Sequence, residues 1–206
     1  ADTLDFDGAV GAATLDSGAG ADSFNFAAAV GAASIDAGVG ADTLTFTGAV
    51  TGATVSGLDD AGDVASLSGT NTLVFTSVGT GAQVSFGTGA DMATFSGAVG
   101  AGSIYGGTGA DTLDFDGAVG AATLDSGAGA DSFNFAAAVG AASLDAGVGA
   151  DTLTFTGAVT GATITGLDDA GDVASLSGTN TLVFTSVGTG AQVSFGTGAD
   201  MATFSG

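Results

Sequence analysis

Hydrophobic and polar residues alternate along short runs that are separated by Gly-rich turns. Residues 3–7 read Thr-Leu-Asp-Phe-Asp, and the shorter run at 13–16 repeats this alternation. A period of two residues is typical of a β-strand with one buried face. The 3.6-residue pattern of a helix is missing, and Gly at this density would cost about 1 kcal/mol for each helical residue it replaced. We therefore expect an all-β chain.

The pair of runs recurs every 20 residues. Units begin at Ala1, Ala21 and Ala41, and the pattern resumes at Thr70 and Ala90. The nine residues AGDVASLSG, at 61–69, interrupt it. Five units and this insert make a super-repeat of 109 residues, because residues 1–97 recur as residues 110–206. The two copies differ only at Ile35/Leu144, Val55/Ile164 and Ser56/Thr165. We divide the chain into super-repeat 1 (1–109) and an incomplete super-repeat 2 (110–206), whose insert is 170–178.

Equivalent positions of the 20-residue units indicate which face is buried. The sixth position is always Phe and the fifteenth is always aliphatic, whereas the positions between them vary among polar residues. The Phe column consists of Phe6, Phe26, Phe46, Phe75, Phe95, Phe115, Phe135, Phe155, Phe184 and Phe204. One unit cannot bury its own apolar face, so successive units must stack. The sequence predicts a parallel β-solenoid, or β-roll, with two strands per 20-residue coil and about ten coils.

The insert at 61–69 has two possible interpretations. It is either a lobe that protrudes from a turn or an extra half-coil, which would move the following turns to the opposite edge. We favour the lobe, because the 20-residue pattern resumes with the same order of strands. Lobes at 61–69 and 170–178 would recur regularly in a longer array, and we expect lateral contacts between arrays there.

Composition narrows the possible partners. The chain has no Lys, Arg, His, Cys, Pro or Trp, and its net charge is −22, entirely from Asp. Nucleic acids and anionic membranes need basic side chains, so we expect neither as a partner. The apolar stretches, such as residues 26–30, are too short to span a bilayer. Ca²⁺ is the ionic partner that so many carboxylates favour.

The residue types also argue against catalysis. An active site needs a nucleophile, a base or a metal with an open position. The chain lacks His, Cys, Lys and Glu, which leaves only Asp pairs such as Asp59 and Asp60 in a loop. We therefore do not expect an enzyme. The absence of Lys and Arg removes every site for trypsin-like proteases, which suits an extracellular, secreted or cell-surface protein.

The Gly-rich turns carry a recognisable motif. Residues 106–114, GGTGADTLD, resemble the nonapeptide GGxGxDxUx of RTX (repeats-in-toxin) proteins, which occurs in giant secreted bacterial surface proteins. Weaker copies are SGAGADSFN at 17–25 and 126–134, AGVGADTLT at 37–45 and 146–154, and FGTGADMAT at 86–94 and 195–203.

The resemblance implies a calcium-binding β-roll in which turn Asp side chains and backbone carbonyls hold Ca²⁺. The implied metal ligands are Asp22, Asp42, Asp91, Asp111, Asp131, Asp151 and Asp200. Stacked coils would also place these carboxylates about 5 Å apart, where their repulsion is about 1 kcal/mol in water and larger at lower dielectric. The alternative is simple turn chemistry, since Gly and Asp favour turns without any ion.

The chain departs from the family in two ways. The usual coil consists of two nonapeptides, whereas here the second turn (residues 8–11) has no Asp, so we expect calcium along one edge only. Asn71 and Asn180 replace the Asp of the motif, and we expect the row of ions to break there.

Near-identical copies and the lack of a polar capping coil indicate a slice of a longer array. The sequence thus predicts a structural repeat segment of an extracellular filament, stalk or surface layer that self-associates into a long array and is rigidified by calcium. The alternative is an adhesin-type binding module that presents a flat sheet face to ice, glycan or mineral. Outward positions change from coil to coil, as at Asp5, Asn25 and Thr45, which favours the structural role.

Overall fold

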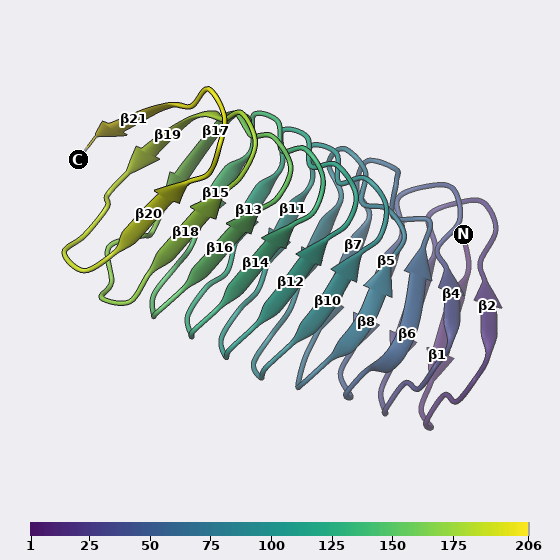
Figure 1. Ribbon diagram of the computed structural model, residues 1–206. Helices are drawn as coiled ribbons and strands as arrows, with labels where there is room; N and C mark the ends of the chain where they lie inside the picture. The colour runs from purple at the N-terminus through teal and green to yellow at the C-terminus, as the bar shows by residue number, and fades with distance from the viewer. Residues whose placement is uncertain (206) are drawn as a thin grey trace.

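The computed structural model describes residues 1–205, which form an all-β parallel solenoid of about ten coils. Each coil contributes one strand to each of two parallel sheets, and the coils stack along one axis with the termini at opposite ends (Figure 1). No helix occurs among the described residues, and hence none that is long and apolar enough to cross a bilayer. The predicted fold class is confirmed.

The first sheet has 11 strands and consists of the odd-numbered ones. They are β1 (Thr3–Phe6), β3 (Ser23–Phe26), β5 (Thr43–Phe46), β7 (Val64–Leu67), β9 (Gln83–Ser85), β11 (Ser103–Tyr105), β13 (Thr123–Asp125), β15 (Ser143–Asp145), β17 (Thr160–Thr165), β19 (Thr181–Thr185) and β21 (Met201–Ser205).

The second sheet has 10 strands and consists of the even-numbered ones. They are β2 (Thr14–Asp16), β4 (Ser34–Asp36), β6 (Thr51–Ser56), β8 (Thr72–Phe75), β10 (Met92–Phe95), β12 (Thr112–Phe115), β14 (Ser132–Phe135), β16 (Thr152–Phe155), β18 (Val173–Leu176) and β20 (Gln192–Phe195).

The core consists of the apolar side chains that alternate with polar ones along each strand and point between the two sheets. Each strand pairs in parallel with the strand one coil further on, so that Leu4 lies beside Phe24 and Phe6 beside Phe26. Like side chains therefore stack in columns: the ring centroids of Phe26 and Phe46 lie 4.7 Å apart with an interplanar angle of 4°. Burial of each such ring contributes about 1.5–3 kcal/mol. The inner members of the predicted Phe column are buried, whereas Phe204 in the last described coil is 54% exposed.

The insert at 61–69 is an extra half-coil, and the predicted lobe is wrong. Residues 64–67 form β7, which pairs with β5 on one side and β9 on the other. Ala65 and Leu67 are buried in register with Leu44 and Phe46 of β5. A lobe would have left both the apolar side chains and the edge of β5 unpaired, which is costly for the backbone as well as the core. In the second copy, β18 is the equivalent strand. The insert therefore provides no protruding lobes for lateral contacts.

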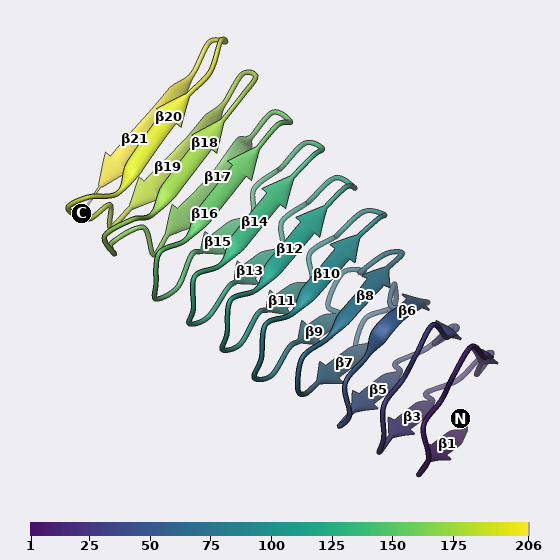
Figure 2. The same ribbon diagram turned by 60° about the horizontal axis from the view of Figure 1, so that its bottom comes forward.

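The half-coil gives a complete super-repeat an odd number of strands, β1 to β11 in residues 1–109. Strands β1 to β11 precede β12, so β12 lies in the second sheet although its sequence, TLDF, is that of β1 in the first (Figure 2). The Phe column is consequently divided into three stacks on alternating sheets. The stacks contain Phe6 to Phe46 in the first sheet, Phe75 to Phe155 in the second, and Phe184 with Phe204 in the first again. Consecutive super-repeats present the same side chains on opposite faces.

Candidate functional site: buried carboxylate ladders at the turns

The Gly-Asp turns form two edges of the solenoid. We call the edge where the chain passes from the second sheet to the first, as at residues 17–22, the first edge. The second edge is where the chain passes from the first sheet to the second, as at residues 86–91. The Asp of each turn immediately precedes a strand. Its side chain is buried in all the predicted ligands except Asp200, which lies exposed in the last described coil.

Hydrogen bonds join the equivalent turn residues of successive coils into rows along each edge. We call each row a ladder and each of its Asp or Asn residues a rung. The backbone N–H of Asp22 donates to Oδ1 of Asp42 at 2.7 Å, and that of Asp42 donates to Oδ1 of Asp63 at 2.8 Å. The same contact recurs along the second edge, for example from the N–H of Asp111 to Oδ1 of Asp131 at 2.8 Å. Each carboxylate thus ties its own coil to the coil before it.

Three ladders lie on alternating edges. The first edge carries Asp22, Asp42 and Asp63, and the second carries Asn71, Asp91, Asp111, Asp131, Asp151 and Asp172. Asn180 and Asp200 begin a further ladder on the first edge. The structure therefore groups the seven predicted ligands as two, four and one. The prediction of a single edge is wrong, because each half-coil moves the motif to the other side.

Sequence reasoning missed two rungs, Asp63 and Asp172, because both lie in the inserts. A signal was present: Asp63 is followed by the alternation Val-Ala-Ser-Leu, as Asp42 is followed by Thr-Leu-Thr-Phe. Asn71 was expected to break the row of ions. In the structure it lies at the start of the second ladder, since its N–H and its Nδ2 both donate to Oδ1 of Asp91, at 2.7 and 2.8 Å.

The second carboxylate oxygen of most rungs has no partner. Within residues 1–205, these Oδ2 atoms are buried and accept no hydrogen bond. The residues concerned are Asp22, Asp42, Asp91, Asp111, Asp131 and Asp151. A buried polar group left unsatisfied costs about 1–3 kcal/mol, and more if it is charged. The ladders therefore favour a proton or a cation at these oxygens.

In six of the rungs the pKa is shifted in the direction that burial dictates, whereas the pKa of Asp22 is lowered. Burial raises the pKa of Asp111 and of Asp151 to about 6. The hydrogen bond from the preceding rung's N–H opposes this rise, and the negative charge of neighbouring rungs adds to it. Burial likewise raises the pKa of Asp42, Asp63, Asp91 and Asp131.

Glycine lets the backbone of successive turns pack closely around these oxygens. A methyl group on Gly106 would lie 2.3 Å from the carbonyl oxygen of Ser126 and 3.1 Å from Oδ2 of Asp111, so both oxygens face the same point. Gly109 has φ +134°, and a Cβ there would lie 1.8 Å from the carbonyl oxygen of Gly89. Any larger residue would fill the space between coils.

These carboxylate and carbonyl oxygens fit a hard cation such as Ca²⁺, which takes 6–8 oxygen ligands from carboxylates, carbonyls and water. The unpartnered Oδ2 atoms would supply the anionic ligands. No three acidic side chains gather at one point among residues 1–205. Backbone carbonyls of the adjacent turns, such as that of Ser126 beside Asp111, would have to supply further ligands.

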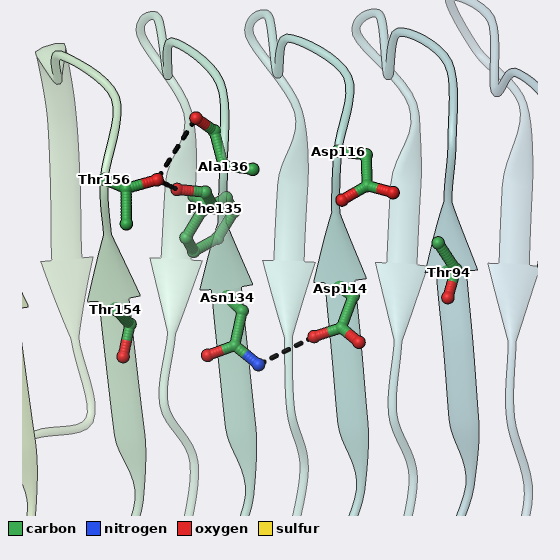
Figure 3. A pocket seen from close by; sticks show the side chains of 8 residues that line it. All are labelled: Thr94, Asp114, Asp116, Asn134, Phe135, Ala136, Thr154 and Thr156. Atoms are coloured by element: carbon green, nitrogen blue, oxygen red, sulfur yellow. Dashed lines mark hydrogen bonds between the residues drawn. The ribbon is translucent and has the colours of Figure 1, made fainter.

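A second polar feature lies on the outer face of the second sheet. A shallow hollow of about 210 Å³ crosses β10, β12, β14 and β16 (Figure 3). Asp114 and Asn134 line it, and Nδ2 of Asn134 donates to Oδ1 of Asp114 at 2.7 Å. The first super-repeat has the same contact at 2.6 Å, between Asn25 and Asp5, on the outer face of the first sheet.

Fold and repeat together define a parallel β-solenoid repeat protein. Comparison of the chain with protein-family models, with curated proteins and with solved structures finds no match. The class is therefore established by the stacked coils themselves.

Proposed function

We propose that this chain is a structural repeat segment of an extracellular filament, stalk or surface layer, rigidified by calcium in the manner of the RTX proteins that its turns resemble. The observation that carries the proposal is the set of buried Oδ2 atoms without a hydrogen-bond partner within residues 1–205. The chain has no Lys, Arg or His that could neutralise them. A cation from solution would satisfy these oxygens while they stay ionised.

Calcium bound in the ladders would act directly on stiffness. In a solenoid each coil contacts only its neighbours, so stability is approximately a sum of coil and interface contributions. A cation held between adjacent rungs strengthens that interface, and its binding free energy becomes folding free energy. Extracellular calcium modules bind with dissociation constants of about 10⁻⁴–10⁻³ M, a range that suits a protein ordered only outside the cell.

Thermal unfolding with excess calcium and with excess chelator tests the proposal. We expect the chelator to lower the Tm markedly while some β-signal survives, since the Phe-rich core needs no ion. Changing Asp111 and Asp131 together to Asn should reduce the calcium-dependent part of the Tm. The matched control changes Asp114 and Asp116 to Asn, which removes the same charge from the outer face and the turn beside it. Identical melting in calcium and in chelator would refute the calcium assignment.

The alternative is an adhesin-type binding module that presents a sheet face to ice, glycan or mineral. The hollow lined by Asp114 and Asn134 favours it, because carboxylate, amide and hydroxyl groups from neighbouring strands line it (Figure 3). Electron microscopy of the assembled protein distinguishes the two roles. Long uniform fibres support the structural role, and isolated rods that decorate a ligand support the binding role.

A further inference from the structure

The ladder on the second edge begins at Asn71, whose side-chain oxygen and nitrogen both have hydrogen-bond partners. Oδ1 of Asn71 accepts from the N–H of Val50 at 3.1 Å. Its Nδ2 donates to the carbonyl of Gly69 at 2.9 Å and to Oδ1 of Asp91. Asn71 is therefore a neutral, buried and satisfied rung. Asn180 repeats the arrangement, with Oδ1 accepting from the N–H of Val159 at 3.2 Å.

The same ladder ends at a carboxylate whose two oxygens both accept hydrogen bonds from backbone N–H groups. Oδ1 of Asp172 accepts from the N–H of Asp151 at 2.9 Å, as the other carboxylates of this ladder accept from the rung before them. Its Oδ2 accepts from the N–H of Asp169 at 2.8 Å, which no other rung of this ladder matches among the described residues. In the first copy, Oδ2 of Asp63 accepts from the N–H of Asp60 at 2.9 Å. The residue just before each insert thus supplies an amide to the oxygen that is unpartnered in the other rungs.

Only the rungs between these two ends have an unpartnered oxygen. On the second edge they are Asp91, Asp111, Asp131 and Asp151. The first-edge rungs Asp22, Asp42 and Asp63 occupy the same positions in the super-repeat as Asp131, Asp151 and Asp172. They show the same order: Oδ2 is unpartnered in the first two and accepts a hydrogen bond from a backbone amide in the third. The pattern is therefore a property of the super-repeat.

We propose that the array carries one closed cation-binding segment of four carboxylates for every 109 residues, spanning the boundary between two super-repeats. Each segment is bounded by a neutral Asn and by an Asp held by a backbone amide, and consecutive segments lie on opposite edges. The inference rests on the proposed function, in which the unpartnered oxygens bind calcium. It assigns Asp63 and Asp172 to the ladder but not to the cation site.

Alternation of edges has a mechanical consequence. A cation that changes the spacing between coils at one edge only would curve the solenoid toward or away from that edge. Because the half-coil moves the segment to the opposite edge after each super-repeat, the curvature of one segment is cancelled by the next. A long array of such super-repeats remains straight when calcium binds, which a rigid filament requires.

The test is a count of bound calcium by equilibrium dialysis on the full 206-residue chain and three variants. Asp131→Asn keeps the Oδ1 acceptor but removes a cation-binding carboxylate, so it should bind fewer ions than wild type. Asp172→Asn removes the same charge from the end of the segment and should bind as many ions as wild type. Asn71→Asp replaces the neutral boundary by a carboxylate and should bind more. Circular dichroism in calcium checks that each variant retains its sheets.

Two results would overturn the closed segment while leaving the calcium proposal in place. One is a loss of ions in Asp172→Asn equal to that in Asp131→Asn, and the other is no gain in Asn71→Asp. If Asp172→Asn loses its sheets, Asn71→Asp alone decides the question. A wild-type chain that binds no calcium would overturn both the closed segment and the proposed function.

Discussion

The turn Asp residues differ from ordinary turn acids in where their side chains lie. Asp111 is buried, accepts one hydrogen bond through Oδ1 and leaves Oδ2 unpartnered among the described residues. By contrast, Asp16, the last residue of β2, accepts a local hydrogen bond from the N–H of Gly18 at 2.9 Å and stays exposed. The same residue type therefore lies in two different environments in this chain, one exposed and one buried.

Without calcium, stability should rise as pH falls from neutral towards 4. The folded-state pKa of Asp111 and Asp151, about 6, lies above the ordinary value of 3.8, so the folded chain binds protons more tightly than the unfolded chain. Stability is then greatest below the lower value and is lost as pH rises through the higher one. Thermal melts in chelator at several pH values between 4 and 8 measure this effect. A Tm that is constant or falls between pH 7 and 5 would contradict it.

The Phe column should be necessary for stacking in the middle of the array. Phe26→Asp would bury an unpaired charge between Phe6 and Phe46, a change that costs several kcal/mol. We expect rapid cleavage by a protease that cuts after Leu or Phe. Thr45→Asp is the matched control. Its side chain lies on the outward face of the same sheet, where Asp5 already occupies the equivalent position two coils earlier. Equal resistance of the two variants would show that the Phe column is not core.

At the scale of elements, the insert strand β7 is the feature that organises the chain. It adds one strand to the first sheet and thereby moves the Asp-bearing turns to the opposite edge, until β18 moves them back. Its pairing also shields the edge of β5, whose N–H and C=O groups would otherwise have no partner within the sheet.

A buried position in β7 should therefore be as sensitive as one in a regular strand. Leu67→Ala should destabilise the chain by about 2–5 kcal/mol, the usual cost for a buried Leu. The outward Ser66→Ala should change stability by no more than about 0.5 kcal/mol. Denaturant unfolding of both variants provides the measurement. If Leu67→Ala were as mild as Ser66→Ala, residues 61–69 would lie outside the solenoid.

At the scale of the whole molecule, two long parallel sheets enclose a thin core, and their outer faces are irregular. Along β1, β3 and β5 one outward column reads Asp5, Asn25 and Thr45. Binding to a crystal lattice requires the same group at every repeat of the surface, so a column of three different side chains offers no such match.

We accordingly expect no ice-binding activity. A solution of the chain at micromolar concentration should show no thermal hysteresis, that is, no gap between its melting and freezing points, in calcium or in chelator. A hysteresis that depends on calcium would instead favour the binding module and would direct attention to the outer sheet faces.

The sequence alone determined the strands, the stacking and the core. Alternation with period two and a 20-residue repeat leave few other ways to bury a Phe in every unit, because a single coil has no apolar partner except the next coil. The super-repeat boundaries and most rungs of the ladders also follow from the repeat.

Only the tertiary structure decided the placement of the insert and of the carboxylates. Residues 61–69 contain one short alternating run, and such a run fits a protruding lobe or a half-coil equally well until strand pairing selects between them. Local turn chemistry likewise does not determine whether Asp111 faces solvent or the interior. Its direction is set by the N–H of Asp91 in the preceding coil, which reaches it only after the coils have stacked.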